Sequence, residues 1–111
     1  MKNRILIKLI LSLTILVTGC AIEATKTVPI EYITGQTQYH RVCANCHGAD
    51  AMGTSKAPKL IHERYNKENF SNGKIAKTIL RGSGSGAMPA QKTKVTETAI
   101  KEIIKYLRYS Q

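Results

Sequence analysis

The pentapeptide Cys43-Ala44-Asn45-Cys46-His47 constrains this chain more than any other stretch. Two thiols separated by two residues, with a histidine directly after the second, have the spacing at which both sulfurs bond to one porphyrin while the imidazole reaches its iron. Few five-residue strings are so specific. We therefore predict that the chain carries one haem c, attached covalently through Cys43 and Cys46, with His47 as an axial ligand of the iron.

Two other kinds of site share the Cys-x-x-Cys spacing. A structural zinc site needs two further ligands, and the remaining side chains of suitable type are Cys20, His40 and His62. A redox dithiol of the thioredoxin kind normally begins a helix in a strand–helix–strand setting, and this sequence shows no such pattern. The residues alone leave both alternatives open, but they favour the haem.

The first 20 residues have the layout of a secretory leader. A charged start is followed by an apolar run from Leu9 to Val17, and the small residue Gly19 precedes Cys20. This pattern resembles a bacterial lipoprotein signal, in which cleavage before the cysteine accompanies attachment of a diacylglycerol to its thiol. A plain transmembrane anchor is the alternative, but the apolar run is short against the roughly 20 residues that a span requires.

The predicted organisation has three parts: a signal peptide over residues 1–19, a lipid-anchored tether over 20–32 and one folded domain over 33–111. Lipidation of Cys20 would leave two of the three cysteines, and the haem uses both. Removing 19 of the 111 residues leaves 92, a chain that buries only a modest core. A covalently held haem would act as a staple for such a small domain.

The basic charge of the chain narrows its partners. The formal net charge is +10, and it falls to +7 without the three leader cations Lys2, Arg4 and Lys8. Nucleic acid is not an expected partner, because an exported protein seldom meets it and one phenylalanine and five tyrosines offer little base stacking. We expect the cations to face an acidic redox protein or anionic lipid headgroups.

Apolar spacing predicts helices and no strands. One helix is expected from Ile33 to Cys46 with Thr34 as its cap, and at least one more between residues 59 and 81 with Asn72 as a candidate cap. The final helix begins at Thr96, and its apolar residues follow the i, i+3, i+4, i+7 rule: Ile100, Ile103, Ile104 and Leu107. Gly35 offers bare backbone against which Tyr106 can pack.

A second informative stretch runs from Gly82 to Ala90 and contains Met88-Pro89. A glycine–serine run is compatible with a mere flexible linker. Glycines, however, also let a chain pass close over a flat macrocycle, and Pro89 stiffens the backbone beside a soft thioether. Met88 follows His47 by 41 residues, which is enough chain to cross to the opposite haem face, whereas Met52 is too near. We predict Met88 as the second axial ligand.

Taken together, the motifs resemble the class I cytochrome c family over nearly all of the predicted mature chain. The matching pieces are Gly35-x-x-x-Tyr39, Cys43-x-x-Cys46-His47-Gly48, Pro58-x-Leu60, Gly86-x-Met88-Pro89 and Ile104-x-Tyr106-Leu107. The resemblance implies an all-α, small cytochrome c fold with three to four helices around one haem. It also implies that the first and last helices cross, that His47 and Met88 ligate iron, and that the Pro58 carbonyl accepts from His47.

One departure from the family concerns the propionates. The chain has no tryptophan, which some relatives place beside a propionate, so Lys56, Arg64 and Tyr65 are the candidates for these contacts. The shortness of the chain resembles the small bacterial members of the family.

The expected function is one-electron transfer and not catalysis, with no small-molecule substrate. The carrier would lie on the periplasmic side of a bacterial cell envelope, anchored by lipid, and would exchange electrons with an oxidase, a reductase or a dehydrogenase. Two alternatives stay open: a haem-based sensor in which Met88 is labile, and the cytochrome subunit of a larger oxidoreductase.

Overall fold

The computed structural model describes residues 21–111. The predicted signal peptide and the predicted lipidation of Cys20 therefore lie outside the described residues. Within the described part, every helix is too short or too polar to cross a membrane.

The described chain is helical and contains no strand. Its order along the sequence is four α-helices and two short 3-10 turns, η2 and η3. These elements are α2 (Ile30–Val42), α3 (Ala44–His47), η2 (Ala49–Ala51), η3 (Glu63–Tyr65), α4 (Asn72–Arg81) and α5 (Glu97–Ser110). The all-α prediction is confirmed.

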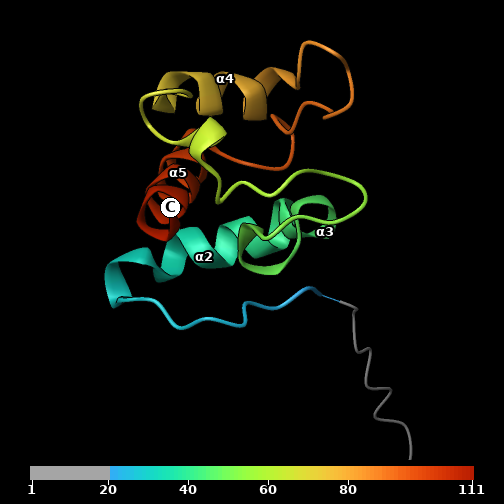
Figure 1. The fold of residues 1–111 in the computed structure, drawn as a ribbon. Helices are drawn as coiled ribbons and strands as arrows, with labels where there is room; N and C mark the ends of the chain where they lie inside the picture. Colours follow the sequence, from blue (N-terminus) through green and yellow to red (C-terminus); the bar gives the residue numbers. More distant parts are fainter. Residues whose placement is uncertain (1–20) are drawn as a thin grey trace, which may run out of the picture.

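The centre of the fold is the contact between the first and last of these helices, α2 and α5 (Figure 1). A Cβ atom built on Gly35 would lie 2.0 Å from the Glu102 carbonyl oxygen and 2.8 Å from Tyr106 Cβ. Tyr39 and Tyr106 pack beside this contact with ring centroids 5.5 Å apart, and both are almost fully buried. The predicted packing of Tyr106 on Gly35 is confirmed, and only a residue without a side chain fits there.

Helix α5 supplies more of the core than any other helix of the described chain. Thr96 caps it, because the threonine side chain accepts from the Ala99 N–H. The predicted stripe is buried, namely Ile100, Ile103, Ile104 and Leu107. Each such side chain stabilises the fold by about 1.5–3 kcal/mol relative to an exposed position.

The start of α2 differs from the prediction. The helix begins at Ile30, directly after Pro29, and Thr34 lies one turn inside it and does not cap it. Proline explains the boundary, because Pro29 is itself extended at the N-cap, with a ψ of 152°, and its ring disfavours a helical conformation of the residue before it. The predicted single helix to Cys46 is also divided, because α2 ends at Val42 and α3 starts at Ala44.

The residues before α2 lie against the domain. Ile22 and Val28 pack on the core, and the Lys26 carbonyl accepts from Gln36 Nε2 at 2.7 Å. This segment runs alongside α2 in Figure 1. Much of the stretch expected to be a free tether is thus in contact with the folded part.

A single arginine joins α5 to the segment before α4. Arg108 donates to the carbonyls of Tyr65 and Phe70 and to the side chains of Asn72 and Gln111. Asn72 had been the expected cap of α4, but Ser71 takes that role by accepting from the Lys74 N–H at 3.2 Å. Asn72 is the first residue of the helix, where its side-chain oxygen serves Arg108.

Candidate functional site

The residues of the pentapeptide motif lie within one turn at the junction of α2 and α3. The Cys43 N–H donates to the Tyr39 carbonyl at 2.7 Å, and the Cys43 carbonyl accepts from the N–H groups of Cys46 and His47 at 3.2 and 2.9 Å. Cys43 is half-buried and Cys46 is exposed, and both thiols are free. The two sulfurs and the imidazole are therefore supplied by one short, hydrogen-bonded helix.

The His47 imidazole is oriented by a backbone acceptor. His47 is only 9% exposed, and its Nδ1 lies 2.9 Å from the Pro58 carbonyl oxygen. Because a carbonyl can only accept, Nδ1 carries the proton and Nε2 has its lone pair free. None of the described residues hydrogen-bonds to Nε2, so this atom is available to a metal.

The loop after His47 is held by a buried phenol and by glycine. The Tyr39 hydroxyl donates to the Gly48 carbonyl at 2.9 Å, and the Gly53 N–H donates to the His47 carbonyl at 2.7 Å. Gly48 adopts a φ of 81°, and a Cβ atom there would lie 2.7 Å from the Gly53 carbonyl oxygen. Gly48 is the residue at which α3 ends, and the loop closes tightly back on the histidine.

The chemistry of the thiols argues against a redox dithiol. Burial raises the pKa of the Cys43 thiol to about 11, and only nearby Arg41 acts in the opposite direction. An attacking dithiol needs a depressed thiol pKa, which helix N-termini in thioredoxin-like proteins supply. The absence of any strand among residues 21–111 removes the strand–helix–strand setting as well.

A zinc site is equally disfavoured in the described part of the chain. No group of three or more His, Cys, Asp or Glu side chains there is placed to hold a metal ion. His40 uses both ring nitrogens, Nδ1 towards the Gln36 carbonyl and Nε2 as acceptor of the Asp50 N–H. His62 caps η3 by accepting from the Arg64 N–H. The donors present suit two thioether bonds and one imidazole ligand, which are the needs of haem c.

Met88 lies in the loop between α4 and α5, half-buried against the core. Ser83 holds its backbone at both ends: Ser83 Oγ accepts from the Met88 N–H at 3.0 Å, and the Met88 carbonyl accepts from the Ser83 N–H at 3.0 Å. Farther along, the Gln91 N–H donates to the Ile79 carbonyl at 2.8 Å. The glycine–serine run is therefore an organised loop at its base and is not an unstructured linker.

The candidates for propionate contacts lie in different places. Lys56 is exposed and lies in a turn near Cys46. Thr54 holds this turn, since its Oγ1 donates to the Cys46 carbonyl and accepts from the Lys56 N–H. Arg64 is exposed on η3, and Tyr65 packs edge-on against Phe70 with centroids 5.6 Å apart. Arg64 and Tyr65 are neighbours on η3, whereas Lys56 lies in the loop after the motif.

Sequence reasoning missed a buried polar cluster next to the motif. Asp50 is only 4% exposed and adopts a φ of 53°, and its Oδ2 accepts from both the N–H and the hydroxyl of Thr25. Its Oδ1 lies 3.7 Å from His40 Nε2 and has no hydrogen-bond partner among the described residues. The burial of Asp50, three residues after the motif histidine, could not be predicted from the sequence, because nothing in the spacing of Thr25 and Asp50 indicates that they are in contact.

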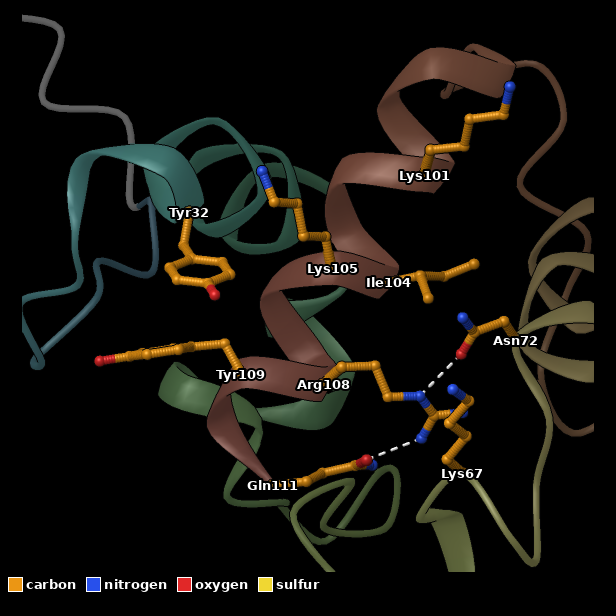
Figure 2. A pocket seen from close by; sticks show the side chains of 9 residues that line it. All are labelled: Tyr32, Lys67, Asn72, Lys101, Ile104, Lys105, Arg108, Tyr109 and Gln111. Carbon is orange, nitrogen blue, oxygen red and sulfur yellow. Dashed lines mark hydrogen bonds between the residues drawn. The ribbon is translucent and has the colours of Figure 1, made fainter.

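A groove of about 710 Å³ lies at the other end of α2 and is basic (Figure 2). Its cations are Lys67, Lys101, Lys105 and Arg108. Tyr32 and Tyr109 stack at one side of it with ring centroids 4.2 Å apart. None of the residues predicted to hold the haem lines this groove, so it is a separate surface feature.

The comparisons with known proteins agree with this geometry. Residues 31–107 match the family described as "Cytochrome C oxidase, cbb3-type, subunit III". No curated protein matches the chain. Among solved structures, the c-type cytochrome KustC0563 superposes with a TM-score of 0.60 at 24% identity, over 69% of this chain and 96% of that one.

The structural likeness shows the fold, and the family match covers well over half of the residues. A cytochrome c domain implies haem c and electron transfer. The chain therefore belongs to the cbb3-type cytochrome c family and is a small, all-helical c-type cytochrome.

Proposed function

We propose that this protein is a membrane-tethered carrier of single electrons with one covalently bound haem, ligated by His47 and Met88. The observation that carries the proposal is the 2.9 Å contact between His47 Nδ1 and the Pro58 carbonyl, which leaves Nε2 free beside two free thiols. The haem, when bound, supplies a reversible one-electron couple. No substrate pocket is needed for this function.

The chain's own residues set the conditions for that couple. Cys43 and Cys46 fix the macrocycle to the α2–α3 junction, and the Pro58 carbonyl holds the imidazole in one tautomer and one orientation. The Met88 thioether is soft and neutral, so it favours the ferrous ion and raises the potential. The buried pair Tyr39 and Tyr106 packs at the contact between α2 and α5, the helices that support the motif.

The partners we propose are redox proteins with acidic docking surfaces: an oxidase, a reductase or a dehydrogenase. Lys56 lies near the Cys46 carbonyl through Thr54, so it is placed to steer a partner towards Cys46, where the haem would be attached. The family match favours one alternative, a cytochrome subunit permanently bound to a larger oxidase. The proposed location is the periplasmic side of a bacterial envelope, with the lipid on Cys20.

The axial ligand is tested by Met88→Ala, with Met52→Ala as the matched control because Met52 is exposed. Met88→Ala should keep covalent haem, abolish the thioether–iron charge-transfer band of the ferric protein, bind carbon monoxide when reduced and lower the potential. Met52→Ala should change none of these. An unchanged spectrum in Met88→Ala would remove this ligand, and ready CO binding by the unaltered protein would favour the sensor.

The docking surface is tested by Lys56→Glu against Lys101→Glu. Both exchanges change the net charge equally, but Lys101 lies in the remote basic groove. At low salt, Lys56→Glu should slow electron exchange with the membrane partner about tenfold, since steering by charge raises association rates by about 10–1000-fold. Equal effects of the two variants in stopped-flow measurements would contradict a localised docking surface.

A further inference from the structure

We propose that residues 22–28 form a latch, closed by Thr25 on Asp50, which holds the motif end of the domain close to the membrane and commits it to a redox partner embedded in that same membrane. The inference rests on the proposed lipid anchor at Cys20. It adds to that proposal a docked segment, a fixed end of the domain and a class of partner. Two independent features of the described residues carry it.

The first feature is the charged contact. Both polar groups that Thr25 can donate, its N–H and its hydroxyl, reach the same oxygen, Asp50 Oδ2, and the N–H contact measures 3.1 Å. Asp50 is 4% exposed. A carboxylate is seldom buried unless donors compensate it, and these two donors come from the segment that covers it.

The Asp50 backbone is itself held in place. Its backbone N–H donates to His40 Nε2 at 3.0 Å, while His40 Nδ1 donates to the Gln36 carbonyl at 2.7 Å. Asp50 and Ala51 both have positive φ angles, of 53° and 60°. Aspartate tolerates this conformation better than most residues, which fits a carboxylate turned out of the loop towards a fixed partner.

The second feature is the packing on either side of Thr25. Ile22 lies three residues before it and Val28 three residues after it, and both are half-buried against the core. Between them, Gln36 Nε2 donates to the Lys26 carbonyl. The segment is therefore attached at four successive points along α2 and the loop that follows α3.

The latch shortens the free part of the anchor. A fully free tether over residues 20–32 would reach about 45 Å, whereas the five residue steps from Cys20 to Thr25 span about 17 Å when extended. Figure 1 shows that the described segment starts near α3 and runs back along α2 to its beginning. The chain thus approaches the lipid from the motif end of the domain and not from the basic groove.

The consequence is a constraint on partners. A domain that is held at its motif end by a short tether stays within a thin layer next to the bilayer. A partner whose redox centre lies in that layer sees a raised local concentration, which falls roughly as the −3/2 power of the tether length. A partner that diffuses through the periplasm gains nothing from the latch.

The first test is trypsin cleavage after Lys26 in the full-length holoprotein on native membranes, read by the mass of the released domain. Thr25→Val removes the hydroxyl donor and keeps the N–H, and Thr27→Val is the control because Thr27 is exposed and donates to nothing described. Loss of a hydrogen bond to a carboxylate should speed cleavage about tenfold. Equal cleavage rates in Thr25→Val and Thr27→Val would overturn the latch.

The second test inserts ten Gly/Ser residues between Ala21 and Ile22, upstream of the latch, and measures oxidation of reduced cytochrome by native membranes and by ferricyanide. The tether from Cys20 to Thr25 grows from five to fifteen residue steps, so the rate of oxidation by native membranes should fall about fivefold. The ferricyanide rate should not change. An unchanged membrane rate would overturn the membrane-embedded partner even if the latch itself exists.

A fractionation control separates this inference from the proposal beneath it. Cys20→Ser should release the protein from membranes. If it stays bound, the lipid anchor is wrong and the tether argument falls with it, while a difference between Thr25→Val and Thr27→Val in trypsin would still establish the docked segment.

Discussion

The two halves of the proposed iron site are built differently. On the His47 side, the imidazole contacts the Pro58 carbonyl, the following turn is pinned by Tyr39, and the supporting helices meet through Gly35. On the Met88 side, the base of the loop is fixed by Ser83, but its tip at Gly84 has no atom within 4 Å of a built Cβ. One half is part of the core and the other is a surface loop.

This difference separates two properties of the protein. Residues on the His47 side should govern whether the domain folds, because they are buried and tightly packed. Residues on the Met88 side should govern how firmly the sixth ligand is held, because local opening costs little where few contacts are made. Stability and ligand lability can therefore be changed independently.

The largest effect is expected from Gly35→Ala. A methyl group would overlap the Glu102 carbonyl at 2.0 Å, and backbone cannot move as a flexible side chain does. We expect a loss of about 3 kcal/mol in the free energy of unfolding or a failure to fold. Denaturant titration followed by haem absorbance measures it.

The control for this prediction is Gly73→Ala in α4. A Cβ atom there would meet only Ser71 Oγ at 3.9 Å, so the exchange should be neutral or stabilise by about 0.5 kcal/mol. Equal losses in the two variants would show that the α2–α5 contact is not the special point of the fold.

A smaller effect is expected from Tyr39→Phe, which removes the shorter of the two hydrogen bonds to the buried Gly48 carbonyl and leaves only the Ala51 N–H at 3.2 Å. The free energy of unfolding should fall by about 1–2 kcal/mol at pH 7. Tyr109→Phe, at an exposed position, should have almost no effect.

The same variant tests a pH dependence. Burial raises the pKa of Tyr39 well above its ordinary value near 10, and burial also raises that of Tyr106. The unfolded chain therefore loses these protons first, so their contribution is fully present below about pH 10 and is lost as the pH rises beyond it. Tyr39→Phe should lose less stability between pH 9 and 11 than the unaltered protein.

The smallest effect on stability, but the one most specific to the ligand, is expected from Ser83→Ala. Loss of the Ser83 hydroxyl removes the acceptor of the Met88 N–H and should cost about 1 kcal/mol. Carbon monoxide should then bind the reduced protein about fivefold faster. Ser85→Ala is the control, because Ser85 Oγ hydrogen-bonds to Ser83 Oγ and to the Ala87 N–H and not to Met88 itself; faster binding in both variants would locate the effect in the whole loop.

Periodicity and capping rules predict most of the helices, because apolar spacing and cap residues are local properties of the sequence. The stripe of α5 and its Thr96 cap are as expected, and the Gly35–Tyr106 contact follows from the need for bare backbone where two helices meet. The start of α2 was predicted wrongly, because threonine is a residue type that often caps helices and Thr34 offers such a residue. The helix instead begins directly after Pro29, whose ring disfavours a helical conformation of the residue before it.

The long-range polar contacts could not be predicted in this way. Arg108 meets acceptors 36 to 43 residues earlier in the chain, and Thr25 meets Asp50 across 25 residues. Neither pairing has a spacing rule, because it depends on how the helices cross. The axial ligands and the propionate contacts remain predictions, and Met88→Ala and Ser83→Ala address the Met88 ligand.

The hydrogen bonds by which Arg108 joins α5 to the segment before α4 affect which conditions the domain tolerates. Its four acceptors are two backbone carbonyls and two side-chain amides, and none of them takes up a proton in mild acid or competes with dissolved ions as a carboxylate would. The closure of α5 onto the segment before α4 is therefore insensitive to acid and to salt. In a medium of changing pH and salt outside a cell membrane, the Arg108 contacts would persist while the charge interactions of exposed lysines and carboxylates change.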